Sequence, residues 1–124
     1  APVSKDKLQK ILEKLTTAGK IDAAAIVRRD GLMISSQLPP EVDKNVIAAV
    51  SARMMDRADM VSGELKRGAV RYVVAHNTKG KMIAMDVQRT AVLICLIKPK
   101  GDTGYALMAM ETAARNIGAL FDSA

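Results

Sequence analysis

Apolar residues recur at helical spacing in three segments of the chain, which predicts three helices. The first begins after Ser4, whose hydroxyl can cap a helix, and stops at Gly19, which suits a left-handed terminal residue. The second begins after Asp43 and runs to about Lys66, and the third follows the turn at 100–104. The predicted core-facing residues are Leu8, Ile11, Leu12 and Leu15, then Val46, Val50, Met54, Val61 and Leu65, and finally Ala106, Ala109, Met110, Ala113, Ile117 and Leu120.

Short apolar stretches bounded by turn residues predict five strands between these helices. Asp30-Gly31 is a hairpin signal between two strands within residues 22–36. The other three strands are predicted at Ala69–His76, Lys81–Arg89 and Ala91–Lys98. Because the run from Ala91 to Ile97 is apolar throughout, we expect a central strand that is buried on both faces.

The predicted order is therefore αββαβββα, in a single domain of residues 1–124. Strands that follow one another usually pair, which favours an antiparallel sheet of the α/β (α+β) class. A central strand buried on both faces requires helices on both sides of that sheet. Ala23, Ala24 and Ala25 fit a strand poorly unless a closely packed helix demands small side chains.

Two features predict contact with another chain. The second helix carries Ala49, Ala52, Arg53, Asp56 and Met60 beside its predicted core stripe, and Ala48 and Met55 nearly opposite. One core-facing stripe does not need so many small and apolar residues, so we expect a second contact surface on this helix. The strand Ala69–His76 has several β-formers and no proline, so nothing guards its edge against a partner strand.

Composition and charge narrow the class of protein. With 124 residues, of which 49% are hydrophobic and 26% charged, the chain suits one globular domain. The single Cys95 cannot form an internal disulfide, and no apolar stretch approaches the roughly 20 residues of a membrane span. The charge of +6 comes from scattered Lys and Arg without interleaved aromatics, which argues against nucleic acid as a partner. We expect a soluble, cytoplasmic protein.

The candidate catalytic residues all have simpler interpretations. His76 is the only histidine and ends a predicted strand, which argues against a catalytic triad or a histidine-rich metal site. Cys95 has apolar neighbours on both sides, as an inert core thiol would. Asp86 has no second carboxylate with an evident reason to lie nearby, so we interpret it as a salt-bridge or rim residue.

Two glycine-containing turns are not interpreted as phosphate sites. Gly80-Lys81 lacks the glycine four residues earlier that a phosphate loop requires, and Met82 replaces its Ser or Thr. Gly101-Asp-Thr-Gly104 leads into a helix, where Asp102 or Thr103 is expected as the cap. The sequence thus predicts a domain that is not an enzyme, with no catalytic, metal or cofactor site.

Three segments together resemble the roadblock family, small domains related to dynein light chains and to regulators of Ras-like GTPases. They are residues 24–36, Val46–Arg53, and Ala91–Ile97 followed by Gly101–Gly104. The resemblance spans nearly the whole chain. It implies a five-stranded antiparallel sheet with the second helix on one face and the first and third helices on the other, a layering that longin and profilin-like domains share.

The resemblance also implies a homodimer in which the third strand and the second helix each pair with their copies. The positions that match are Val70, Arg71, Tyr72, Val73 and Val74 on the strand, and Ala49, Arg53 and Met60 on the helix. The resemblance further implies that such dimers are platforms for small Ras-like GTPases and do not supply a full catalytic site. A GTPase is therefore the expected partner, contacted by Ala52, Met55 and Asp56 of the second helix.

Two questions stay open from the sequence. Arg53 suits either an ion pair within the dimer or a contact to a partner's phosphate or carboxylate. A dimeric domain that senses a small molecule enclosed by its layered sheet is the alternative function, although a chain with three aromatic residues offers little to line such a pocket.

Overall fold

The computed structural model describes residues 3–18 and 20–124, and its elements follow the predicted order αββαβββα. They are α1 (Lys5–Thr16), β1 (Ile21–Arg28), β2 (Met33–Gln37), α2 (Lys44–Glu64), β3 (Tyr72–Asn77), β4 (Gly80–Val87), β5 (Ala91–Ile97) and α3 (Thr103–Asp122). The predicted helix stop at Gly19 lies outside the described residues.

The three helix starts follow from capping side chains. The Ser4 hydroxyl accepts the Lys7 N–H at 3.4 Å, and the Asp43 carboxylate accepts the N–H groups of Asn45 and Val46. Asp102 accepts the Tyr105 N–H at 3.0 Å, so the turn before α3 serves as a helix cap, as predicted. Each cap satisfies a backbone donor that the first helical turn leaves free.

The strands form one antiparallel sheet in the order β2-β1-β5-β4-β3. The apolar β5 lies at its centre, which confirms the prediction from its uninterrupted hydrophobic run. β2 and β3 are the edge strands. β3 begins at Tyr72, three residues later than predicted, and β4 ends at Val87 because residues Gln88 and Arg89 form a tight turn with positive φ.

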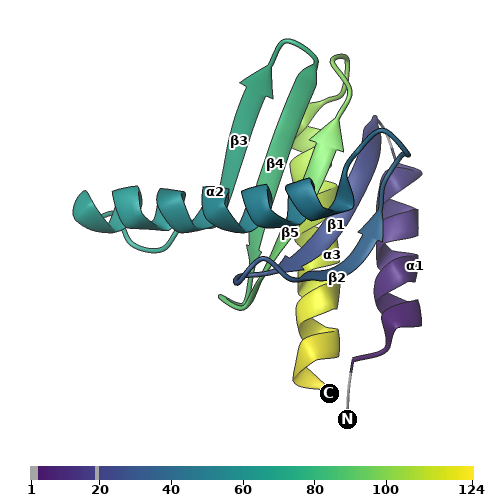
Figure 1. Ribbon diagram of the computed structural model, residues 1–124, viewed down its shortest axis with the longest axis horizontal. Helices are drawn as coiled ribbons and strands as arrows, with labels where there is room; N and C mark the ends of the chain where they lie inside the picture. Colours follow the sequence, from purple (N-terminus) through teal and green to yellow (C-terminus); the bar gives the residue numbers. More distant parts are fainter. Residues whose placement is uncertain (1–2, 19) are drawn as a thin grey trace.

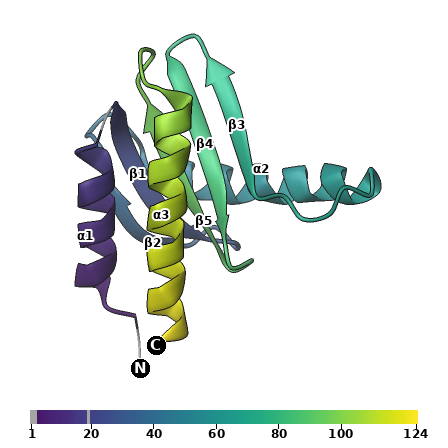
Figure 2. The same cartoon turned by 180° about the vertical axis from the view of Figure 1, so that it is seen from behind.

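The helices cover both faces of the sheet, as the two views in Figure 1 and Figure 2 show. α1 and α3 pack on one face against alternate strand residues that include Ile26, Leu93 and Cys95. α2 packs on the other face against Ala25, Val27, Val92 and Ile94. Alternation along each strand thus builds two separate cores.

Small side chains line the contact between α2 and the sheet. Ala25 of β1 belongs to the same buried cluster as Ala48 and Ala52 of α2. Without bulky side chains between them, helix and strand backbones can lie close together. This explains why an alanine-rich segment is a strand here despite the weak β-propensity of alanine.

Candidate functional site

The outer edge of β3 is open among the described residues. Asp86 N–H donates to the Arg71 carbonyl oxygen at 2.9 Å, which makes Arg71 and Asp86 a hydrogen-bonded pair. Such pairs alternate along an antiparallel ladder, so Val73 also directs its backbone groups toward β4. The N–H and C=O groups of Tyr72 and Val74 consequently point away from the sheet, where a further strand can bind.

The side chains of β3 divide between the two faces of the sheet. Val73 lies opposite Ala84 on the α2 face, while Tyr72 lies opposite Met85 on the face of α1 and α3. α3 does not extend over β3 (Figure 2), and Tyr72 and Val74 are accordingly about 40% exposed. Two apolar side chains therefore flank the open edge.

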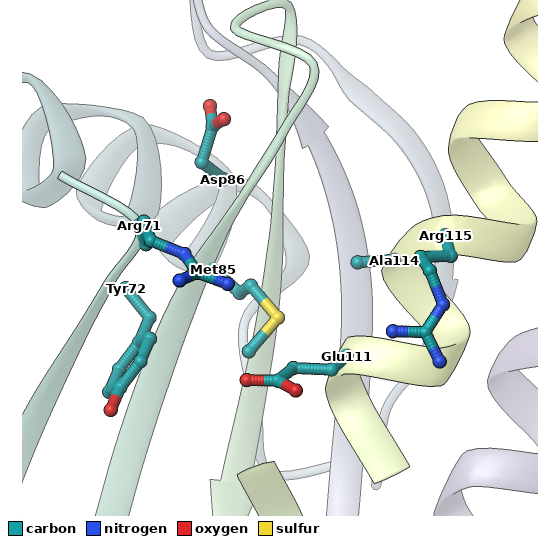
Figure 3. Close-up of a pocket in the computed structure, with 7 residues that line it drawn as sticks. All are labelled: Arg71, Tyr72, Met85, Asp86, Glu111, Ala114 and Arg115. Atoms are coloured by element: carbon teal, nitrogen blue, oxygen red, sulfur yellow. The ribbon is translucent and has the colours of Figure 1, made fainter. Parts of the chain in front are cut away.

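A hollow of about 260 Å³ lies between this edge and α3 (Figure 3). Arg71 and Glu111 extend toward it from β3's approach and from α3. Its volume is below the ~300–1,000 Å³ that is usual for small-molecule sites, and charged side chains contribute much of its lining. The lining residues are Arg71, Tyr72, Met85, Asp86, Glu111, Ala114 and Arg115. The hollow does not by itself favour a small-molecule sensor.

The face of α2 that packs on the sheet differs from the predicted one. Ala48, Ser51, Ala52 and Met55 are buried against the sheet. Four residues of the predicted core stripe are exposed instead, with 58% of Val46, 48% of Val50, 58% of Val61 and 66% of Leu65 accessible, whereas Met54 is half-buried and packs against this core. The helix is apolar on two sides, and the side with the smaller residues packs on the sheet because it permits the closer approach.

This arrangement corrects part of the predicted partner site. Ala52 and Met55 were expected to contact a GTPase, but both are buried within their own chain and offer no surface to another protein. Asp56 is exposed, as that role requires. Ala49, Arg53 and Met60, predicted for the dimer interface, are exposed as well.

Two flanks of α2 border the face that packs on the sheet. Ala49 lies beside Gly31, so its flank faces the β1–β2 turn. Residues seven or eleven apart return to the same side of a helix, so Asp56 and Met60 share that flank, which we call the turn flank. The opposite flank carries Val50, Met54, Val61 and Leu65 of the apolar stripe. The end of α2 extends beyond β3 (Figure 1), bringing both flanks past the sheet edge.

A network of two arginines and two aspartates lies under α2. Arg29 donates to Asp59 of α2 at 2.8 Å and to Asp86 of β4 at 2.6 Å. Arg89, in the β4–β5 turn, donates to Asp59 at 3.0 Å. The salt-bridge interpretation of Asp86 is thus confirmed. Burial would raise the pKa of Asp59, but hydrogen bonds from Arg89, the Val70 N–H and Arg29 outweigh it and hold that pKa well below its usual range.

The turn that presents Arg89 is conformationally costly. Gln88 and Arg89 have φ values of 52° and 63°, and Thr90 N–H closes the turn on the Val87 carbonyl at 3.1 Å. Two central residues with positive φ define a type I′ turn, which normally takes Asn and Gly. Each side chain in this region costs about 1–2 kcal/mol. The side chains of these two residues link the turn to helices on both faces of the sheet: Arg89 donates to Asp59 of α2, and Gln88 donates to Asp122 of α3.

Two common features of active sites are a reactive cysteine and a cluster of metal ligands. Cys95 is fully buried, and burial raises the pKa of its thiol, so the reactive thiolate is disfavoured. No cluster of three potential metal-ligating side chains occurs among the described residues. Across those residues, no helix combines the length and apolar character that crossing a bilayer requires.

Comparison with known proteins decides the family. A family model described as "Roadblock/LC7 domain" matches residues 7–97, well over half of the chain. The chain belongs to the Roadblock/LC7 family. The matched part of this roadblock domain contains α1 except its first two residues, α2 and all five strands, whereas α3 lies beyond it.

The chain is also similar to individual proteins in sequence and in structure. An uncharacterised protein of Methanocaldococcus jannaschii is 27% identical over 114 residues, which cover 92% of this chain and 99% of that protein. Among solved structures, Myxococcus xanthus MglB has a TM-score of 0.92 at 15% identity, covering 99% of this chain and 93% of its own. A structure titled "MglB with tetrameric arrangement" has a TM-score of 0.86 at 12% identity, with coverages of 96% and 90%. At these identities the structural likeness shows the fold of the roadblock domain.

Sequence reasoning found the strand edge and the surplus apolar surface of α2, but it missed the ion-pair network. Arg29, Asp59, Asp86 and Arg89 are up to 60 positions apart, and no local pattern links them. One signal was available: Gln88-Arg89 separates two apolar strands by a gap too short for anything but a tight turn.

Proposed function

We propose that this roadblock domain is a homodimeric platform that binds a small Ras-like GTPase and regulates or localises it. The observation that carries the proposal is the open edge of β3 beside an α2 whose exposed stripe is apolar. An unpaired strand edge and a solvent-exposed row of Val and Leu both favour burial against a partner. We name a small GTPase as the partner because of the family to which the chain belongs, and we assign no catalytic group to the domain.

A second copy of the chain can occupy both features at once. Pairing β3 with its copy in antiparallel orientation extends the sheet and brings the two α2 helices onto the same face. The strand part of this interface is Val70, Arg71, Tyr72, Val73 and Val74. For the helix part we propose the stripe residues Val50, Met54, Val61 and Leu65, with Arg53 on the ridge between the flanks. The structure with a tetrameric MglB arrangement supports self-association in a protein of this fold.

The turn flank of α2 then stays accessible for the GTPase. It combines the exposed Met60 with the charged Asp56. The exposed Leu32 belongs to the β1–β2 turn, which this flank faces. Apolar residues among charged ones are typical of surfaces that bind other proteins transiently. We therefore assign Ala49 and Met60 to the GTPase-binding surface in place of Ala52 and Met55.

Two proline variants test the dimer. Val74→Pro blocks the open edge without removing a β3–β4 hydrogen bond, because the Val74 N–H faces outward; we expect a folded monomer by sedimentation velocity and circular dichroism. Val73→Pro is the matched control, since its N–H faces β4 and its loss should destabilise the chain itself. A wild-type chain that stays monomeric at tens of micromolar contradicts the dimer.

Binding to purified Ras-like GTPases, each loaded with GDP or a GTP analogue, tests the platform. Calorimetry should show binding to one of them, and Asp56→Arg with Met60→Ala should abolish it without dissociating the dimer. Met108→Ala, on the far face of the sheet, is the control and should bind normally. Stabilisation of the domain by a small molecule in a thermal-shift screen, without any GTPase binding, would instead favour the sensor.

A further inference from the structure

Asp59 connects the two elements from which the proposed dimer is built. Its Oδ1 atom accepts the Val70 N–H at 2.9 Å, two residues before β3 begins. Its Oδ2 atom accepts Arg29 Nη1 at 2.8 Å and Arg89 Nη2 at 3.0 Å. One carboxylate on α2 thus binds the approach to the edge strand and two turns at the end of the sheet.

Asp59 lies where α2 loses its apolar support. Met55 is fully buried, whereas every residue from Asp56 to Glu64, all of them described, is at least partly exposed. We call residues 56–64 the overhang; Figure 1 shows it extending past β3. Besides the bonds of Asp59, a hydrogen bond of 2.6 Å from Ser62 Oγ to the Gly68 carbonyl holds it. These polar contacts tie the overhang to the segment before β3 and to the turns at the end of the sheet.

Two energetically unfavourable features accompany these contacts. Arg29 Nε is buried without a hydrogen-bond partner among the described residues, although buried donors are nearly always paired. Arg89 occupies a positive-φ position that would be less strained with glycine. Strain and an unsatisfied donor that persist together indicate a role for the groups they place.

We propose that Asp59 is a positioning residue for self-association: it holds the overhang at a set orientation to β3, so that strand edge and apolar stripe engage a second copy together. This inference rests on the proposed homodimer. Two contact regions held in one rigid body bind with less loss of conformational freedom than two regions that move independently. A loosened overhang would leave the strand edge to pair alone.

The variant Asp59→Asn tests this role, because an amide keeps the size but carries no charge and offers one acceptor oxygen in place of the two that Val70, Arg29 and Arg89 use. We expect the dimer dissociation constant, measured by sedimentation velocity, to rise about tenfold or more. Hydrogen exchange should accelerate at residues 59–70 and stay unchanged in α3. Asp30→Asn is the matched control: it removes the exposed Arg28–Asp30 pair, neither member of which bonds to Asp59, and should leave the dissociation constant unchanged.

A general loss of stability must be distinguished from misplacement of the overhang. Ile117→Val creates a small cavity in the α3 core and lowers the unfolding temperature without touching α2. If it weakens the dimer as much as Asp59→Asn does, the positioning role is wrong. If Asp59→Asn fails to fold, Arg89→Gln takes its place as the test variant. Arg89 is 51% exposed, and the substitution removes the ion pair between Arg89 and Asp59. Arg89→Lys keeps the positive charge and should restore part of the lost dimer affinity.

The outcomes separate this inference from the proposed function. A wild-type chain that is monomeric refutes the homodimer, and the role of Asp59 with it. A wild-type dimer whose dissociation constant is the same in Asp59→Asn and Arg89→Gln, despite faster exchange at residues 59–70, refutes the positioning role and leaves the homodimer in place.

Discussion

Val61→Ala tests whether the apolar stripe of α2 is the helical part of the dimer interface. Val61 is 58% exposed in the single chain and lies on the overhang, so its methyl groups contribute little to the fold of the monomer. Alanine also has the higher helix propensity, and the substitution should leave monomer stability unchanged or raise it slightly. Any weakening of the dimer can then be attributed to the contacts that the Val61 side chain makes with the second copy.

The expected loss can be worked from the exposed fraction of Val61. The substitution removes two carbon groups, each contributing about 0.8 kcal/mol when buried. With 58% of the residue still available for burial, the loss is about 0.9 kcal/mol per copy. Two-fold symmetry doubles it to about 1.9 kcal/mol, which corresponds to a roughly 20-fold higher dissociation constant.

Sedimentation velocity over a concentration series measures this constant, and thermal unfolding at low concentration confirms that the monomer is intact. Met108→Ala is the matched control, because Met108 is 70% exposed on α3 but lies on the opposite face of the sheet. Equal dissociation constants for Val61→Ala and wild type would show that the stripe is not in the interface. A Met108→Ala effect as large as that of Val61→Ala would contradict the face assignment.

Three further predictions concern the single chain. Gly80→Ala should destabilise the fold by about 2 kcal/mol or more in chemical denaturation, because Gly80 has a φ of 133° and a Cβ there would lie 2.0 Å from the Ile97 carbonyl oxygen. The folded-state pKa of Asp59 is below its unfolded value of about 3.9, so its contribution to stability is present above that pH and lost as the pH falls; Asp59→Asn should flatten the decline of stability in acid, and an unchanged slope would contradict this. Cys95 should react with a thiol reagent only at the rate of unfolding, and rapid labelling of the folded protein would show that it is accessible.

The sequence predicted most of the fold because its signals are local. Capping side chains, the Asp30-Gly31 turn and the apolar run of β5 each act within a few residues, and the structure confirms all three. The position of β5 at the centre of the sheet also follows locally, since a strand without polar positions has no face to present to water.

The orientation of α2 shows where such reasoning fails. Periodicity identified the stripe of large apolar residues and assigned it to the core, yet Ala48, Ala52 and Met55 lie there. Both sides of the helix are apolar, so the pattern could not choose between them. The choice depends on the surface that the helix meets: Ala25 of β1 lets Ala48 and Ala52 of α2 approach the sheet closely.

The sequence by itself determined the elements, their order and the existence of a surplus apolar surface on α2. Tertiary structure decided which side of α2 is surplus, which backbone groups of β3 are open, and which distant charges meet beneath the overhang. The physical reason is the distance along the sequence over which each interaction acts. Helix caps, turns and the alternation of side chains along a strand depend on neighbouring residues. Packing faces, ladder phase and the pairing of Arg29 and Arg89 with Asp59 depend on segments that meet only when the whole sheet has formed.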